Sequence, residues 1–332
     1  MDSLTQIVLG IATAELVAVK KLQNKTFLYG AMLGTIPDLD IVVGKFLSDV
    51  EGVAIHRGLS HSFLFFVFLS PALGFLISKI EKNKISFKSA SLLSLSCLVT
   101  HVLLDVFTSW GTQILWPLDY RFALKTIFVI DPLYTIPLLI SLIFVWKNKD
   151  SLIRRKFVIR GLIISSSYLL ITCILKLFAV HQFEKALQYQ NIAHQELIVK
   201  QTDFNCILWN ANVSTSKGYY IADYSLFDSQ PIQFVFYSKN RELEKKLVNS
   251  YDFQQLKKIS EGWFLVTEQN HRLYFNDLRF GLLNDSPENP QFAFSYQMIP
   301  MSDGIYWAKE VPKAKRDGKA LLEKIFTRLK GN

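Results

Sequence analysis

The sequence predicts an α-helical multi-pass membrane bundle of about six helices, followed by a C-terminal α+β domain outside the membrane. Half of the 332 residues are hydrophobic, and nearly all long apolar runs lie before residue 180. Only 20% of the residues are charged, whereas roughly 25% is usual for a soluble globular chain. We therefore expect a membrane-embedded domain at residues 1–180 and a water-soluble domain at residues 181–332.

Six apolar segments before residue 180 are candidate membrane spans. A helix needs about 20 mostly apolar residues to cross a hydrocarbon core of about 30 Å, and these segments are short, so the buried helical bundle of a soluble protein is the alternative. The number of segments and the short basic connections between them favour the bilayer. The segments are Leu4–Val19, Phe27–Phe46, Phe63–Ile77, Ser89–Trp110, Pro132–Trp146 and Gly161–Leu175.

Positive charge alternates between the connections that join these segments. The first, third and fifth connections hold 13 of the 18 Lys and Arg residues found before residue 181, and the other two hold four. Because Lys and Arg accumulate in cytoplasmic loops, the N-terminus and residues 181–332 are predicted to lie on the extracytoplasmic side. The positive charges gather on no single face, so we expect no nucleic-acid partner despite a net charge of +9.

The C-terminal part has the pattern of an α+β domain. Glu242–Ile259 and Gly318–Leu329 carry apolar residues at three- and four-residue spacing, which predicts helices. A polar helix around residues 181–200 would join this domain to the last span, and Asn270–His271 would form a hairpin turn. Five segments rich in aromatic and β-branched residues are predicted strands: Tyr219–Leu226, Ile232–Tyr237, Trp263–Glu268, Arg272–Phe280 and Gln291–Met298.

Ionisable side chains in or beside the apolar segments are candidate functional residues, because charges in a membrane span are costly. His101 and Asp105 lie one helical turn apart in the fourth segment and face the same way. The predicted orientation gathers further groups with them on the outer side. These are Asp38 and Asp40 late in the second segment, His56, Arg57 and His61 before the third, and Asp131 before the fifth.

This combination of side chains predicts a metal site. Imidazoles with carboxylates suit zinc, or manganese or iron where oxygen donors dominate. His56 and His61 cannot both face one way on a regular helix, so we expect a loop or a helix start there. The predicted ligands or partners of ligands are His56, His61, His101, Asp105, Asp38 and Asp40.

Several of these residues also have a structural interpretation. Pro37 would break the second helix, and Pro37–Asp40 could be a turn with a helix cap. Asp131, which precedes Pro132, could cap the N-terminus of a helix. Arg57 could extend to the membrane interface. His101 and Asp105 could be a hydrogen-bonded pair between helices.

Six short motifs carry these residues, and together they resemble a known family. They are Met1-Asp2-Ser3-Leu4-Thr5-Gln6, Gly34-Thr35-Ile36-Pro37-Asp38-Leu39-Asp40, His56-Arg57-Gly58-Leu59-Ser60-His61-Ser62, His101-Val102-Leu103-Leu104-Asp105, Thr108-Ser109-Trp110-Gly111-Thr112 and Ile130-Asp131-Pro132-Leu133-Tyr134-Thr135. Over about residues 1–180 the set resembles the YdjM-like family of membrane-bound metal-dependent hydrolases, which implies a bacterial inner-membrane protein. That family is remotely similar to zinc-dependent phospholipases C, helical proteins with an H-x-x-x-D ligand pair that His101 and Asp105 match.

The function favoured at this point is hydrolysis of a phosphoester at the outer membrane face. A bound metal would activate water and polarise phosphoryl oxygens, Arg57 would neutralise phosphate charge, and Asp131 could orient a ligand or serve as a base. A site at headgroup depth suits a phospholipid or a lipid-linked phosphate. The alternative is a non-catalytic membrane protein with a structural or sensory metal site and a partner-binding outer domain. An ion or proton pathway ranks last, because the inner halves of the spans contain mainly Glu15.

Overall fold

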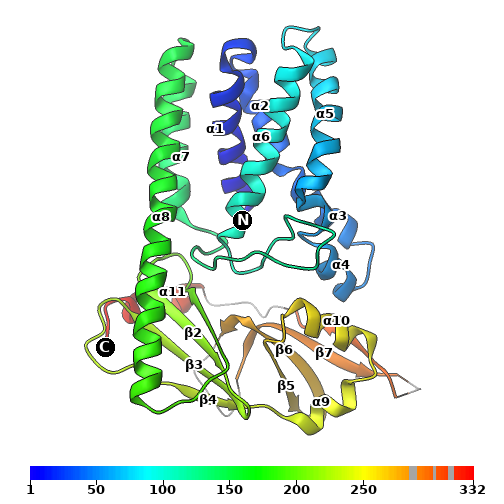
Figure 1. The fold of residues 1–332 in the computed structure, drawn as a ribbon, viewed down its shortest axis with the longest axis vertical. Coiled ribbons are helices and arrows are strands. Elements are labelled where there is room, and N and C mark those ends of the chain that lie inside the picture. Colours follow the sequence, from blue (N-terminus) through cyan, green and yellow to red (C-terminus); the bar gives the residue numbers. More distant parts are fainter. Residues whose placement is uncertain (284–289, 302–303, 313–317) are drawn as a thin grey trace. The chain divides into compact units, whose positions relative to one another are not determined.

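The computed structural model describes residues 1–283, 290–301, 304–312 and 318–332. These residues form two compact units. The helical unit comprises Met1–Val42, Ile55–Ile174 and Asp203–Asn205, and the β-rich unit comprises Val43–Ala54, Leu175–Thr202 and Cys206–Asn332 (Figure 1).

Each of the six predicted apolar segments corresponds to a helical region. These are α1 (Ser3–Leu22), α2 (Lys25–Thr35) with its continuation, α5 (Phe63–Ile80), α6 (Phe87–Val106), α7 (Pro132–Lys147) and α8 (Ser151–Tyr189). Four of them, α1, α5, α6 and α8, are long and apolar enough to cross a membrane, and α2 with its continuation would be a fifth span. The predicted class, a multi-pass helical bundle with an α+β domain, is confirmed.

Among the six expected spans, α7 is the one whose length falls short. This helix has 16 residues, which corresponds to about 24 Å at 1.5 Å per residue, less than the thickness of the hydrocarbon core. Pro132 starts it and Asn148 ends it. By length and composition, four or five of the described helices can therefore cross a bilayer.

The outward surface of these helices is apolar. Phe68 of α5, Ile143 of α7 and Leu170 of α8 are exposed, together with many other large aliphatic and aromatic side chains. Large contiguous apolar surfaces are rare on soluble monomers and common where a protein faces lipid. The exposed side chains therefore agree with a helical bundle that is surrounded by lipid.

Pro37 ends α2, as predicted. The chain continues as the 3-10 helix η1 (Pro37–Leu39) and the short helix α3 (Asp40–Gly44), and this continuation is bent by 49° from α2. The bend takes Asp38 and Asp40 off the axis of α2, at the end of the helical unit where the chain also enters α5.

Helices α1 and α2 pack with their backbones in contact. An added Cβ at Gly10 would lie 2.2 Å from the carbonyl oxygen of Gly30, and one at Gly34 would lie 2.6 Å from that of Gln6. Only glycine permits so close an approach. The C-terminal turn of α2 is therefore held directly against the first turns of α1.

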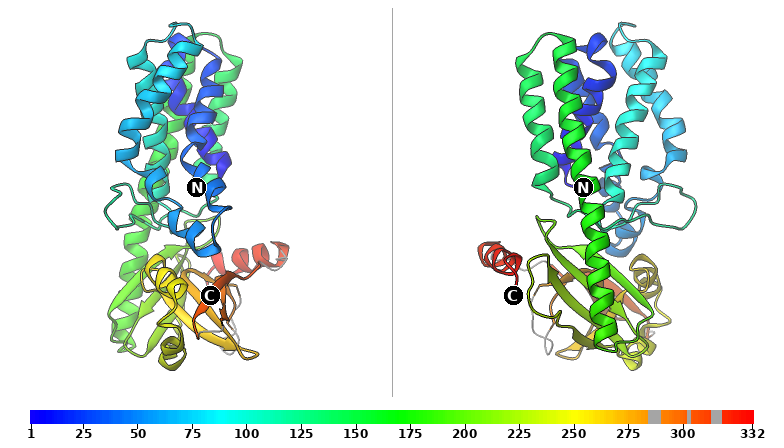
Figure 2. Two further views of the ribbon diagram at one scale, coloured as in Figure 1. Left: turned by 90° about the vertical axis from the view of Figure 1, so that its right-hand side faces the viewer. Right: turned by 60° about the vertical axis from the view of Figure 1, so that its left-hand side comes forward.

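The candidate site residues and the basic connections lie at opposite ends of the helical unit. α1 begins, α2 ends, α5 begins, α6 ends and α7 begins at one end of the helical unit, as the views in Figures 1 and 2 agree. The Lys-rich and Arg-rich connections after α1, α5 and α7 lie at the opposite end (Figure 1). The candidate site residues therefore meet at the end away from most of the positive charge.

The β-rich unit contains two four-stranded antiparallel sheets, each in sequential strand order. The first consists of β1 (Glu196–Gln201), β2 (Leu208–Ser214), β3 (Gly218–Ser225) and β4 (Val235–Ser238). The second consists of β5 (Phe264–Gln269), β6 (Arg272–Leu282), β7 (Phe292–Pro300) and β8 (Tyr306–Glu310). Helices α4 (Asp49–Ile55), α9 (Arg241–Leu247), α10 (Tyr251–Ile259) and α11 (Gly318–Leu329) complete it. A core that includes Ile221 and Leu278 contains residues of both sheets.

The five predicted strands are present as β3 to β7, and three more were missed. The polar helix expected around residues 181–200 is wrong in its second half, because α8 ends at Tyr189 and β1 begins at Glu196. The helix expected over Glu242–Ile259 is divided, and Ser250 stands at the N-cap of its second part, α10. The hairpin turn at Asn270–His271 is confirmed, with left-handed φ angles of 50° and 59°.

Candidate metal centre

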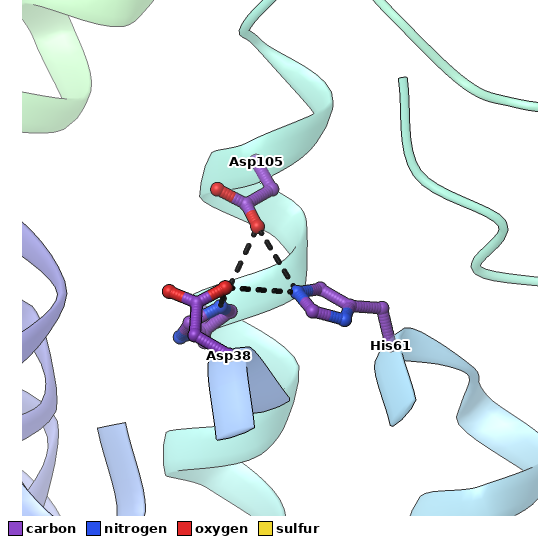
Figure 3. A group of neighbouring side chains, drawn as sticks. Asp38, His61 and Asp105 are labelled. Carbon is purple, nitrogen blue, oxygen red and sulfur yellow. Dashed lines mark ion pairs between the residues drawn. The ribbon is translucent and has the colours of Figure 1, made fainter. Parts of the chain in front are cut away.

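Four side chains from three parts of the helical unit each direct one donor atom to a common region. They are Asp38 of η1, His61 of the 3-10 helix η2 (Leu59–His61), and His101 and Asp105 of α6. Figure 3 shows Asp38, His61 and Asp105 pointing toward one another. Their donor atoms, with that of His101, all lie within 4.8 Å of each other.

Three of these donor atoms are buried without a hydrogen-bond partner among the described residues. They are Nε2 of His61, Nε2 of His101 and Oδ2 of Asp105, and their side chains are almost completely shielded from solvent. A buried polar atom without a partner costs about 1–3 kcal/mol. Three such atoms that face one another call for a shared partner, and a cation can serve all three.

The spacing of the donors fits a divalent cation. Donor atoms arranged tetrahedrally at roughly 2.0–2.2 Å from zinc are separated from each other by roughly 3.3–3.6 Å. Nε2 of His61 lies 3.3 Å from Asp38 Oδ1 and 3.4 Å from Asp105 Oδ2. Nε2 of His101 lies 3.6 Å and 3.4 Å from the same two oxygens.

The second nitrogen of each imidazole is already engaged. Nδ1 of His101 lies 2.6 Å from the carbonyl oxygen of Gly34, to which it must donate. Nδ1 of His61 lies 2.9 Å from Oγ of Ser60, whose own proton goes to Asp40 at 2.7 Å. Because a hydroxyl has one proton, His61 also donates through Nδ1. Such hydrogen bonds leave the Nε2 lone pairs for a metal, as is usual for ligating histidines.

The second oxygen of Asp105 is engaged as well. Its Oδ1 accepts a hydrogen bond from Nε2 of Gln6 at 3.1 Å and lies 3.2 Å from Nη2 of Arg57. The α-amino group of Met1 contacts the same oxygen. In His61, His101 and Asp105, the side-chain nitrogen or oxygen that faces away from the common region therefore has a partner. Asp38 differs, because its side chain is 17% exposed.

Asp40 and His56 form a second group with Asp38, but their geometry favours orientation of neighbours. Oδ1 of Asp40 lies 3.0 Å from Nδ1 of His56, and Oδ2 accepts from the backbone amide of Arg57 at 3.0 Å and from Ser60. Both carboxylate oxygens are thus occupied, and the structure places Asp40 behind His61. The predicted loop between the two histidines is present, and Arg57 turns it with a left-handed φ of 59°.

Arg57 is buried and has protein partners. Its Nη1 donates to Oγ1 of Thr108 at 2.8 Å, beside the contact of Nη2 with Asp105, while its Nε has no hydrogen-bond partner among the described residues. A guanidinium held in this way adds positive charge to the site. The structure does not present it as a snorkelling group at an interface, which was one of the interpretations left open.

Asp131 belongs to neither donor group. Its Oδ1 accepts from the backbone amides of Leu133 and Tyr134 at 3.0 and 3.3 Å, and its Oδ2 accepts from the hydroxyl of Tyr168 at 2.9 Å. Burial raises the pKa of this carboxyl, and the three hydrogen bonds oppose that rise. The geometry matches the helix cap that the Asp131–Pro132 pair allowed, and a role as base or ligand partner stays a prediction.

The pKa values of His61 and His56, which lie outside the spans, are shifted in opposite directions. Burial opposes a charged imidazole, but the nearby carboxylates of Asp105, Asp38 and Asp40 raise the pKa of His61 to about 9. A cation that binds at its Nε2 must therefore displace a proton. Burial is the main cause that lowers the pKa of His56, and Arg57 adds to it.

Three neutral groups at the site were not given a role from sequence. Each forms a hydrogen bond with the atom of a donor residue that faces away from the common region: Gln6 with Asp105 Oδ1, Ser60 with His61 Nδ1, and the carbonyl of Gly34 with His101 Nδ1. The signal available for Gln6 was a polar carboxamide within the apolar segment Leu4–Val19. Attention to ionisable groups alone passes over such side chains.

The fold and the site define a multi-pass membrane protein with a buried His and Asp group that fits a divalent cation. The chain belongs to the YdjM inner membrane protein family, whose model matches residues 1–178. It is also 24% identical over 234 residues to the uncharacterized protein YfhP of Bacillus subtilis (strain 168), an alignment that covers 67% of each chain. No solved structure matches it.

Proposed function

We propose that this protein is a metal-dependent hydrolase that cleaves a phosphoester of a phospholipid or lipid-linked phosphate at the extracytoplasmic face. One observation carries the proposal. Three buried donor atoms that lack a hydrogen-bond partner within the described part of the chain face one another, and the remaining polar atoms of the same side chains are held by neighbours. This is the arrangement expected of metal ligands with their supporting hydrogen bonds.

Asp38, His61, His101 and Asp105 would hold the cation, with zinc favoured by the two imidazoles, and manganese or iron as alternatives. When bound, such an ion supplies a Lewis acid and an activated water at neutral pH. Ser60 and Asp40 fix the ring of His61. Asp38 is the most exposed donor residue, so we assign the substrate side to it. Arg57, beside Asp105, contributes a positive charge that favours an anionic phosphate.

The surface around this end of the helical unit supports a lipid substrate. Residues 107–131 connect α6 to α7, and within them Leu118 is 62% exposed and Tyr120 63% exposed. Leu124 and Leu115 are exposed in the same connection. Apolar and aromatic side chains at the end of a membrane helix suit the headgroup region. A reacting phosphate of a lipid would then lie at the depth of the donors.

A non-catalytic metal site is the second candidate, and the burial of the donors favours it. Structural zinc sites are closed by four protein ligands, whereas catalytic sites keep a position for water. Four donors are present here, and three of them are shielded from solvent. In this alternative, metal would change stability or partner binding without turnover.

The test is a phosphoesterase assay on purified protein in detergent micelles or lipid vesicles. Wild type loaded with Zn²⁺ or Mn²⁺ is assayed on phosphodiesters and phosphomonoesters, including phospholipids. We expect turnover that His61→Ala abolishes and that His181→Ala, at an exposed position of α8, leaves unchanged. A metal-loaded wild type that is inactive on the whole panel contradicts the hydrolase proposal and favours the non-catalytic site.

A further inference from the structure

Gln6 contacts the metal centre from behind. Its side chain is buried in the second turn of α1. Nε2 donates to Oδ1 of Asp105 at 3.1 Å and to the backbone carbonyl of His101 at 3.3 Å. Both acceptors belong to one turn of α6, so a single carboxamide contacts the turn that carries two of the four donors.

This contact is one of three that engage a single oxygen of Asp105. A carboxylate can bind a cation through one oxygen or through both. Here Oδ1 is held by Gln6, by Arg57 and by the α-amino group of Met1, while Oδ2 has no hydrogen-bond partner among the described residues and lies 3.4 Å from Nε2 of both His61 and His101. Because Oδ1 is engaged, the geometry favours binding through Oδ2 alone.

The orientation of the carboxamide is fixed by chemistry. If the amide were flipped, Oε1 of Gln6 would face the oxygens of Asp105 and His101, and no proton would lie between them. Nε2 must therefore face α6, and Oε1 is left buried without a hydrogen-bond partner in the residues that the structure describes. An apolar side chain would fill the space between α1 and α6 without that penalty. Packing alone does not explain a glutamine here, whereas its bond to Asp105 does.

The backbone contact between α1 and α2 fixes the position of Gln6 relative to the donor residues. The carbonyl oxygen of Gln6 lies against Gly34, where an added Cβ would approach to 2.6 Å. The carbonyl of Gly34 in turn accepts from Nδ1 of His101. The same close contact thus positions the partners of two donor residues.

We propose that Gln6 is a positioning residue that presents Asp105 to the cation through one oxygen and holds the His101 turn beside it. The proposal rests on the metal centre of the proposed function. Gln6 is not one of the four donor residues. It acts through Asp105, so its loss changes the affinity and coordination of the metal before it changes anything else.

The test compares Gln6→Met with Thr13→Val. Met fills a similar volume without a donor. Thr13 is a matched control, because it is buried on α1 about two turns after Gln6 and its Oγ1 meets Oγ1 of Thr100 on α6 at 3.3 Å without a contact to a donor side chain. The dissociation constants of Zn²⁺ and Co²⁺ are measured by competition with a chromophoric chelator, together with the visible spectrum of bound Co²⁺ and the apo Tm. Gln6→Asn, which keeps the carboxamide but is one methylene shorter, is the second variant if Gln6→Met does not fold.

We expect the Gln6 variant to bind metal about 10- to 100-fold more weakly, as for other outer-shell partners, with a changed Co²⁺ spectrum. Thr13→Val should retain the affinity and the spectrum of wild type. Unchanged binding by the Gln6 variant, or equal weakening by Thr13→Val, overturns the positioning role while the metal centre stands. A wild type that binds neither ion overturns the metal centre itself and the positioning role with it.

Discussion

Replacement of Gly34 by Ala tests whether the close contact of α1 with α2 sets the geometry of the metal centre. The new Cβ would lie 2.6 Å from the carbonyl oxygen of Gln6 and 3.2 Å from Cα of Gly10. Carbon contacts are optimal at about 3.5–4.0 Å. Both close neighbours are backbone atoms, so the helices must separate by an amount on the order of 0.5–1 Å.

Moving the two helices apart would lower both the stability and the metal affinity of the protein. Overpacking of a well-packed interior costs about 1–3 kcal/mol, and the higher helix propensity of Ala offsets about 1 kcal/mol of that. The same displacement moves the Gly34 carbonyl from Nδ1 of His101, which is 2.6 Å away. Loss of such a supporting hydrogen bond typically lowers metal affinity about 10- to 100-fold. We therefore expect a small loss of stability and a large loss of metal binding.

Gly74→Ala is the matched control. Its Cβ would lie 2.2 Å from Oγ and 2.5 Å from the backbone nitrogen of Ser91, where α5 packs on α6 outside the donor group. Chelator competition gives the metal affinity, and thermal unfolding of the apo form in detergent gives the stability. Gly74→Ala should lose stability and retain affinity. The reasoning is refuted if Gly34→Ala binds metal like wild type, or if both variants lose affinity equally.

Three further predictions concern stability, metal removal and orientation. Arg154→Met should lower the free energy of unfolding by about 3–5 kcal/mol, because it leaves Glu15 buried without its ion-pair partner; a denaturant titration checks this, and recovery of most of the loss is expected when Glu15→Leu is added. Removal of metal with EDTA should lower the Tm of wild type, since a ligand at 100 times its Kd stabilises by about 2.7 kcal/mol, and should leave the Tm of His101→Ala unchanged. Alkaline phosphatase fused after residue 332 should be active and fused at Lys84 inactive; the reverse pattern would contradict the predicted orientation.

The helical unit could be predicted from sequence because its signal is local. Runs such as Phe63–Ile77 are too apolar for a surface that faces water, and Pro37 and Pro132 mark a helix end and a helix start. The strands were harder. β1 was hidden in a stretch expected to be helical, although Leu197, Ile198 and Val199 favour a strand. β2 contains two asparagines, which are depleted in strands generally, yet it is a central strand.

The site was predictable in its residue types and less so in their roles. Costly polar groups in or beside the apolar segments pointed to the four candidate donors, but the sequence could not separate a candidate ligand from a residue that holds it in place. Asp38 and Asp40 are two residues apart, and only the bend at Pro37 shows that Asp38 faces the donors while Asp40 serves His56 and Ser60. Gln6 was overlooked because its partner Asp105 is 99 residues away in the chain.

Metal analysis of purified protein tests the central claim most directly. Wild type, His61→Ala, His101→Ala and the control His181→Ala are purified without chelators, dialysed against trace Zn²⁺, and measured by plasma mass spectrometry alongside protein concentration. The buried donor group predicts stoichiometric metal in wild type and in His181→Ala, and loss of metal in both site variants. Stoichiometric metal retained by His61→Ala and His101→Ala would contradict the account.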